Sequence, residues 1–167
     1  SHHLVLVFRD QHIGDDEQLA LARCFGEPEL HPIRGALGDP SLLHDIVDTP
    51  ESVPDRDGWH TDVTYMERPP AAAVLRCEET PDAGGDTLWA NMELAYEKLS
   101  PGMQQYLAAL RGFHATGEKF RSYIERHLPE EAGEKVMAAV GSGASHPIVR
   151  THPETGRKAL FVERSFM

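Results

Sequence analysis

One short stretch, Trp59-His60-Thr61-Asp62-Val63-Thr64-Tyr65, constrains this chain more than any other. Its β-branched and aromatic residues favour an extended backbone. In a strand the side chains at positions i and i+2 point to the same face, so His60 and Asp62 would converge there. An imidazole and a carboxylate on one face are two of the three ligands of a facial triad, which holds non-haem Fe(II) with open positions. Taken alone, a His-x-Asp pair is more often an exposed strand end.

The composition limits the classes of protein to be considered. A chain of 167 residues with 40% hydrophobic and 26% charged residues is typical of one globular domain, here residues 1–167. A formal net charge of −11 argues against nucleic acid or an anionic membrane as the partner. No apolar run approaches the roughly 18 residues of a membrane span. Cys24 and Cys77 form no CxxC pattern, so we expect two reduced, buried thiols in a cytoplasmic protein.

Hydrophobic patterns and turn residues predict a succession of short elements. We expect strands at residues 4–8, 44–48, 60–65, 72–77, 87–89, 112–116, 146–151 and 158–162, the last two forming a hairpin. We expect helices at residues 15–25, 92–99 and 130–140 and one that begins at Pro101, with Asn91 and Ser100 as N-caps. Residues 27–40 are expected to be a loop. Many short strands with helices on one side predict a β-rich α+β fold, a barrel or jelly roll decorated by helices.

Three segments together resemble a known family. They are residues 59–65, the Gly-Gly-Asp-Thr-Leu-Trp-Ala-Asn segment at 84–91, and the His-Pro-Ile-Val-Arg-Thr-His-Pro-Glu-Thr-Gly-Arg-Lys-Ala-Leu-Phe-Val segment at 146–162. They are similar to the taurine dioxygenase (TauD/TfdA) family of Fe(II)- and 2-oxoglutarate-dependent dioxygenases. The resemblance runs from about Leu4 to the last residue. It implies a double-stranded β-helix, the cupin-like form of the jelly roll.

The resemblance also implies roles for individual residues. His60 and Asp62 match the first two iron ligands, and Thr87 matches the threonine that binds the distal carboxylate of 2-oxoglutarate. His31 matches a histidine that contacts the sulfonate of taurine, although a solvated loop histidine is the alternative for that position. Phe120 matches an aromatic residue of the same substrate pocket, although a core aromatic is the alternative.

Two departures from the family pattern bear on the substrate and on the iron. Arg56 stands where taurine-specific members carry an asparagine, and its guanidinium favours an anion over the ammonium group of taurine. We therefore expect a small anionic substrate, such as an alkyl sulfonate, an alkyl sulfate or an aryloxy acid. The family's second iron-ligating histidine and its 2-oxoglutarate-binding arginine would follow residue 167, so the β-helix is expected to be incomplete at the C-terminus.

The resemblance thus implies an enzyme that hydroxylates its substrate next to the heteroatom and releases succinate and CO2. Its cofactors would be Fe(II) and 2-oxoglutarate, and its partners the anionic substrate and O2, without nucleic acid or membrane, in a homo-dimer or homo-tetramer. Two alternatives stay open: a zinc hydrolase that uses His60 and Asp62, and a non-catalytic binding domain or pseudoenzyme of the same fold. His146 and His152 are interpreted as structural positions of the hairpin, and His114 has no assigned role.

Overall fold

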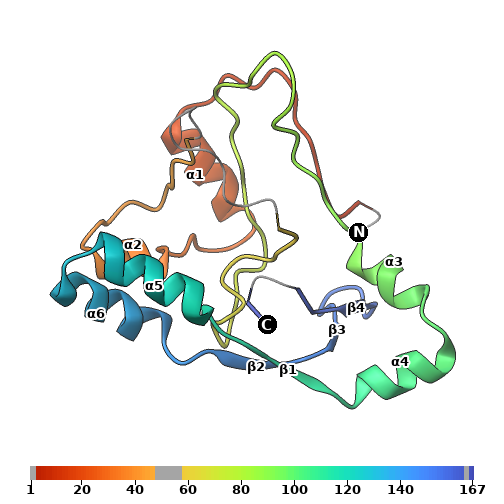
Figure 1. The fold of residues 1–167 in the computed structure, drawn as a ribbon. Helices are drawn as coiled ribbons and strands as arrows, with labels where there is room; N and C mark the ends of the chain where they lie inside the picture. Colours follow the sequence, from red (N-terminus) through yellow and green to blue (C-terminus); the bar gives the residue numbers. More distant parts are fainter. Residues whose placement is uncertain (1–2, 48–57, 164–165) are drawn as a thin grey trace.

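The computed structural model describes residues 3–47, 58–163 and 166–167. Within these ranges, helices precede and separate four short strands (Figure 1). The elements are α1 (Asp15–Arg23), α2 (Pro32–Ala36), α3 (Met92–Glu97), α4 (Pro101–Ala108), β1 (Arg111–His114), α5 (Gly117–His127), α6 (Glu130–Val140), β2 (Ala144–Pro147), β3 (Val149–Thr151) and β4 (Lys158–Leu160).

The predicted helix starts are confirmed by their caps. The Asn91 side chain accepts a hydrogen bond from the Leu94 N–H at 2.9 Å, and the Ser100 hydroxyl accepts one from the Met103 N–H at 3.3 Å. These bonds satisfy backbone donors that have no partner within the first turn of a helix. α3 and α4 therefore begin where the sequence placed them. α1 and α6 also begin at the predicted residues, while α1 and α3 each end two residues before the predicted end.

Two helices were not predicted. Residues 27–40 were expected to be a loop, but α2 begins directly after His31 because Pro32 occupies its first turn, where a missing N–H costs nothing. α5 begins at Gly117, in a stretch whose polar composition hid its helical periodicity. Its apolar side, with the 3% exposed Ile124, packs against α6, where Val136 is fully buried. Burial on a neighbouring helix supplies the stability that local propensity does not.

The strands form two small antiparallel sheets that are joined at one corner. β1 pairs with β2, so that Gly112 lies opposite His146. β3 pairs with β4, which confirms the hairpin predicted at residues 146–162. Ile148 links the two sheets: its N–H donates to the Leu110 carbonyl at 3.1 Å, and its carbonyl accepts from the Phe161 N–H at 2.8 Å. This corner brings the end of the chain back beside β1.

The fold prediction is confirmed only in part. The described chain is α+β, but it does not form a double-stranded β-helix. The strands expected at residues 4–8, 44–48, 72–77 and 87–89 are extended, largely exposed segments without a ladder, residue 48 lying outside the described ranges. Backbone becomes a strand only when a neighbour accepts its hydrogen bonds, and the described residues offer these segments none. Residues 3–5 and 89–91 do line one shared surface pocket.

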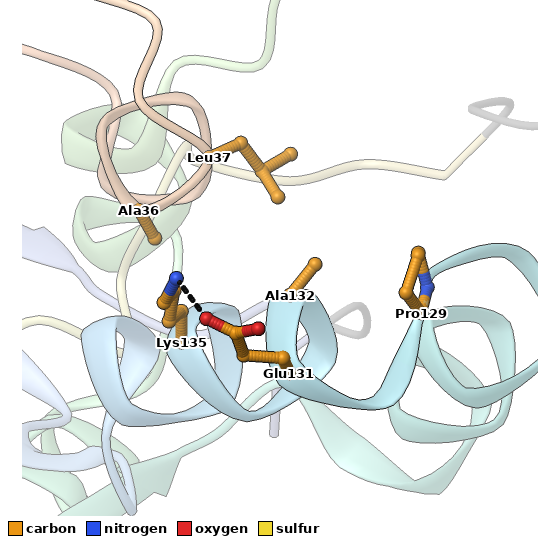
Figure 2. Close-up of a pocket in the computed structure, with 6 residues that line it drawn as sticks. All are labelled: Ala36, Leu37, Pro129, Glu131, Ala132 and Lys135. Carbon is orange, nitrogen blue, oxygen red and sulfur yellow. Dashed lines mark hydrogen bonds and ion pairs between the residues drawn. The ribbon is translucent and has the colours of Figure 1, made fainter.

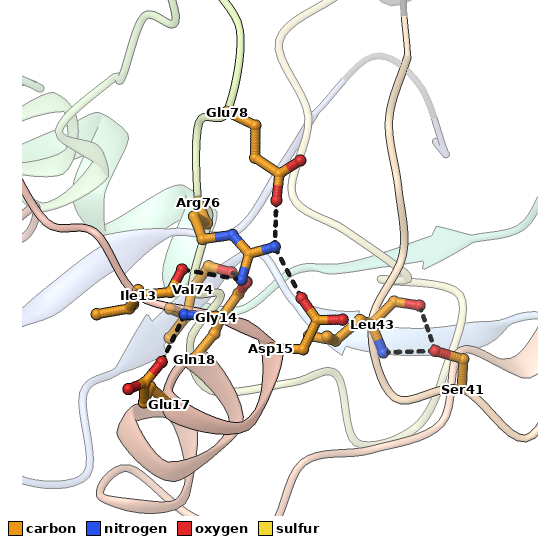
Figure 3. A network of polar contacts seen from close by, with 10 residues as sticks. All are labelled: Ile13, Gly14, Asp15, Glu17, Gln18, Ser41, Leu43, Val74, Arg76 and Glu78. Carbon is orange, nitrogen blue, oxygen red and sulfur yellow. Dashed lines mark hydrogen bonds and ion pairs between the residues drawn. The ribbon is translucent and has the colours of Figure 1, made fainter.

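A polar network ties α1 to the extended segment at residues 72–77 (Figure 3). Arg76 donates from Nη2 to Asp15 at 2.8 Å and also to the carboxylate of Glu78. The Gln18 side chain donates to the Val74 carbonyl at 3.2 Å. These contacts join parts of the chain about 60 residues apart and fix the first turn of α1, whose acidic residues complement the helix dipole.

The apolar core lies beneath residues 62–66. Val63, Tyr65 and Val140 form a buried cluster, and Phe120 and other partly buried residues pack against it. Gly143, between α6 and β2, has a φ of +105°, and a Cβ there would collide with the His114 carbonyl oxygen. Only glycine allows this close approach of the two strands.

Two other expectations concern the cysteines and the membrane. Cys24 and Cys77 are both exposed, so the prediction that they are buried was wrong. They lie at the end of α1 and in an unpaired extended segment, and no layer of the described structure covers either position. None of the helices in the described ranges is long and apolar enough to cross a membrane.

Candidate metal centre

The segment that carries the predicted metal ligands is a turn, not a strand. Residues 62–65 are in turn conformation, and the Met66 N–H donates to the Val63 carbonyl at 2.9 Å. Val63 has a φ of 47°, which is rare for a β-branched residue. The extended preference of Val63, Thr64 and Tyr65 is therefore overridden by tertiary contacts, since all three side chains are buried.

His60 and Asp62 nevertheless converge. His60 Nε2 lies 3.4 Å from Asp62 Oδ1, and both residues are exposed. His60 Nδ1 lies 2.8 Å from the Gly58 carbonyl oxygen, which can only accept a hydrogen bond. The proton of a neutral His60 therefore sits on Nδ1, and the Nε2 lone pair faces the carboxylate. A backbone partner of this kind is what orients a metal-bound histidine.

The donor atoms fit one metal ion. Two ligand atoms that each lie about 2.1 Å from a metal are separated by roughly 3.0 Å at a right angle and roughly 3.4 Å at a tetrahedral angle. The observed separation of 3.4 Å lies at the upper end of that interval. The described residues hold no cluster of three or more His, Cys, Asp or Glu side chains that could bind a metal. Within the described residues, the turn therefore offers an imidazole nitrogen and a carboxylate oxygen as two possible donors, and no third such side chain joins them.

The Val63 and Tyr65 side chains of the turn belong to the apolar core. Burial, with the nearby Asp62 carboxylate, raises the pKa of Tyr65 to about 12, so its phenol stays protonated at neutral pH. Phe120, on α5, packs against the cluster that contains Val63 and Tyr65. Its place next to the turn is compatible with the predicted substrate contact and with the alternative of a core aromatic.

The other predicted site residues lie on separate segments. His31 is the half-buried N-cap residue of α2, and its ring meets the His44 ring edge-on at 5.5 Å between centroids. Thr87 is exposed on an extended segment that precedes α3 and does not form the predicted strand. Arg56 lies outside the described residues. The structure therefore brings together His60 and Asp62, with Phe120 behind them.

Sequence reasoning missed a buried polar cluster directly behind the turn. It consists of Thr64, His114, His146 and Glu163, and we call it the histidine cluster. His114 Nδ1 lies 3.0 Å from the Thr64 hydroxyl, which donates to Glu163 Oε1 at 3.3 Å. His146 Nε2 lies 2.8 Å from the Thr64 carbonyl oxygen. The members are up to 99 residues apart, and the only sequence signal was that His146 belongs to a family motif.

Burial has an electrostatic consequence in this cluster. His114 is fully buried, and its desolvation, together with the neighbouring His146, lowers its pKa below the ordinary value of 6.5, while Glu163 opposes the shift. The two imidazole rings meet edge-to-face at 5.2 Å, and Phe161 stacks on His114 at 5.4 Å. His114 is therefore held as a neutral hydrogen-bonding group.

A surface pocket lies away from these residues. The pocket of about 280 Å³ in Figure 2 lies between α2 and α6, and an ion pair of 2.7 Å between Glu131 and Lys135 runs along its α6 side. Its lining is formed by Ala36, Leu37, Pro129, Glu131, Ala132 and Lys135. None of these is a predicted site residue, so the turn at residues 58–66 remains the candidate centre.

An imidazole and a carboxylate on one turn are two of the three ligand types of a non-haem facial triad. Comparison with known proteins gives the family. The family model described as "Taurine catabolism dioxygenase TauD, TfdA family" matches residues 1–167, and the chain belongs to this family. The expected resemblance is thereby confirmed.

Several curated proteins are similar along nearly the whole chain. An alkylsulfatase of Acinetobacter baylyi is 36% identical over 167 residues, which are 98% of this chain and 52% of that protein. An alpha-ketoglutarate-dependent sulfate ester dioxygenase of Pseudomonas putida is 33% identical, over 97% of this chain and 56% of that protein. An alpha-ketoglutarate-dependent sulfonate dioxygenase of Saccharomyces cerevisiae is 32% identical, over 97% and 40%. The chain spans about half the length of the curated relatives it matches.

Proposed function

We propose that this protein is an Fe(II)- and 2-oxoglutarate-dependent dioxygenase that hydroxylates a small anionic organic substrate next to its heteroatom and releases succinate and CO2. The observation that carries the proposal is the convergence of His60 Nε2 and Asp62 Oδ1 at 3.4 Å, with Nδ1 anchored on the Gly58 carbonyl. Membership of the family supports the same reading. The complete protein would have the double-stranded β-helix and be a cytoplasmic homo-oligomer.

The proposed chemistry is divided between the metal and the chain. Iron, with 2-oxoglutarate and dioxygen, supplies the oxidising power when bound. His60 and Asp62 would hold the metal, and the anchored His60 ring keeps its lone pair in the ligand direction. Tyr65 stays neutral beneath the turn and adds no second anion to the site. The apolar cluster behind the turn excludes water from that side.

The remaining residues are assigned to the cosubstrate and the substrate. The Thr87 hydroxyl would donate to the distal carboxylate of 2-oxoglutarate, a charge-assisted hydrogen bond. His31, Arg56 and Phe120 would bind the substrate. Imidazole and guanidinium groups suit a sulfate, sulfonate or carboxylate, and the aromatic ring suits an apolar tail.

The substrate class follows from the relatives and from Arg56. The similar proteins are named for sulfate esters and sulfonates, and one from Sphingobium herbicidovorans, 32% identical, is an (S)-phenoxypropionate/alpha-ketoglutarate-dioxygenase. All three substrate types are small anions. We therefore propose alkyl sulfates, alkyl sulfonates and aryloxy acids as the compounds to screen first.

The test is anaerobic addition of Fe(II) and 2-oxoglutarate to the purified protein at its full natural length. The expected result is the weak visible charge-transfer band of the iron–2-oxoglutarate chelate, which His60→Ala abolishes. His127→Ala is the matched control, because His127 is an exposed histidine at the end of α5 whose Nδ1 bonds to the Tyr123 carbonyl at 2.8 Å. The control should retain the band.

Three outcomes would contradict the proposal in whole or in part. A preparation of verified mass that shows no band has no assembled iron site, and the non-catalytic binding domain then becomes the better explanation. A band that survives in His60→Ala would mean that iron binds elsewhere. A band without succinate formation in the substrate screen would leave the metal site standing and reject the proposed substrate class.

A further inference from the structure

The turn that carries Asp62 is held in a strained conformation. Val63, the next residue, has a φ of 47°. A β-branched residue keeps such a backbone angle only where the surrounding structure over-determines it. The bond from the Met66 N–H to the Val63 carbonyl closes the turn, but this single hydrogen bond does not explain why the turn persists.

His146 supplies a contact that spans the turn. Its Nε2 lies 2.8 Å from the Thr64 carbonyl oxygen and 3.0 Å from the Met66 carbonyl oxygen. Carbonyl oxygens only accept, so Nε2 carries the proton and one N–H is shared between two backbone acceptors. His146 is 5% exposed and sits on β2, where its register opposite Gly112 is fixed. We call this shared hydrogen bond from His146 to the Thr64 and Met66 carbonyls the clamp. Because the register of β2 is fixed by β1, the clamp is anchored on a rigid strand.

The Thr64 side chain makes a second attachment. Glu163 Oε1 accepts the Phe166 N–H at 2.8 Å and the Thr64 hydroxyl at 3.3 Å. The hydroxyl has thus used its proton and accepts from His114 Nδ1 at 3.0 Å. Thr64 is fully buried. Its carbonyl and its hydroxyl are both bound, two residues after Asp62.

We propose that His146, supported by His114, is a positioning residue that fixes the turn and thereby aims His60 and Asp62 at the metal. It acts through the backbone of residues 64–66 and touches neither the metal nor its ligands. The inference rests on the proposed function for its consequence, because the aim matters only if the turn binds a metal. Partners that hydrogen-bond directly to a metal ligand are worth roughly 10–100-fold in metal affinity, and we expect an effect within that range for a residue that fixes the ligands through the backbone.

The test compares two amides of different reach in the full-length protein. Glutamine can place its amide N–H close to the position of Nε2, whereas asparagine places it near Nδ1, out of reach of both carbonyls. Both substitutions keep a polar side chain in the core. The two variants therefore differ in whether the hydrogen bonds to the Thr64 and Met66 carbonyls can form. His152→Asn is the control, because His152 Nδ1 accepts only the Glu154 and Thr155 N–H groups within its own turn of the hairpin.

Two readouts are measured. The first is the affinity for Co(II), a spectroscopic probe of the site, followed by its visible absorption. The second is amide hydrogen exchange of Met66, relative to the amides of α6. We expect His146→Asn to weaken metal binding roughly 10–100-fold and to speed Met66 exchange by at least about tenfold, while His146→Gln and His152→Asn stay within about threefold of wild type.

The outcomes separate this inference from the proposed function. Unchanged Met66 exchange in a folded His146→Asn variant would overturn the clamp, whatever the metal does. Equal affinities for Co(II) in His146→Asn and wild type would overturn the positioning role. If wild type binds no metal, the proposed function falls, and the positioning role falls with it. If His146→Asn does not fold, His146→Gln is tested with the same two measurements. The glutamine amide can donate in place of Nε2, so a loss of Met66 protection in this variant would reject the assigned contact.

Discussion

Replacing Thr64 by valine removes one hydroxyl group from the histidine cluster and leaves the shape of the side chain almost unchanged. Thr64 is fully buried, its hydroxyl donates to Glu163, and it accepts from His114 Nδ1. After the replacement, the His114 N–H is buried without an acceptor. Glu163 keeps the Phe166 N–H and loses the hydroxyl.

The magnitude follows from these losses. A buried donor without a partner costs about 1–3 kcal/mol, and a lost hydrogen bond to a carboxylate adds about 1 kcal/mol at this long separation. The added methyl group returns about 0.8 kcal/mol of hydrophobic burial. We expect Thr64→Val to lower the free energy of unfolding by about 1–3 kcal/mol. Thr64→Ser keeps the hydroxyl and loses one methyl, so it should cost only about 1 kcal/mol.

The assay is urea denaturation followed by circular dichroism, with both variants and wild type measured at one pH near 7.5, where His114 is neutral. The order of the two variants decides the question. If the polar network dominates, the valine variant is the less stable one. If Thr64→Ser is less stable than Thr64→Val, packing dominates at this position, and the hydrogen-bonded cluster contributes little to holding the turn.

Three further perturbations test other parts of the structure. Because burial and the neighbouring His146 lower the pKa of His114 below 6.5, the unfolded chain binds this proton more readily, so stability should fall as the pH drops below about 6.5. His114→Asn keeps a donor near Nδ1 but does not titrate, so its denaturation midpoints should depend less on pH between about 7 and 5, and an unchanged slope would refute the assignment. Val136→Ala empties space at a fully buried position of α6 and should cost about 2 kcal/mol in urea denaturation, whereas a cost below about 0.5 kcal/mol would mean that the site collapses freely. Asn91→Ala removes the cap of α3 and should cost about 1 kcal/mol, while Asn91→Asp, which can still accept from Leu94, should be close to wild type.

Local signals in the sequence were sufficient where the interaction itself is local. Asn91 and Ser100 cap their helices three residues ahead, and the hairpin turn between β3 and β4 closes within a few residues. Such bonds need no distant partner, so the residue types alone predict them. The same reasoning failed for the strands at residues 4–8 and 72–77. A strand needs a neighbouring strand to share its hydrogen bonds, and the hydrophobic pattern of a segment does not identify that neighbour.

The candidate site shows the same division. The sequence determined that His60 and Asp62 lie two residues apart and near each other, and it gave the family motif that surrounds them. The convergence of the two side chains was predicted correctly, but from a strand. In the structure the pair converges on a turn in which Val63 has a positive φ. Convergence at such short separation survives either backbone shape, because the two Cα atoms stay close in both.

Only the tertiary structure decided what holds that turn. His146 reaches the Thr64 carbonyl across 82 residues, and His114 reaches the Thr64 hydroxyl across 50. Neither histidine carries a periodicity, cap or turn signal that points to residue 64. Their partners are fixed by the register of β1 against β2 and by the packing of both strands beneath the turn, which depends on the whole chain rather than on any segment of it.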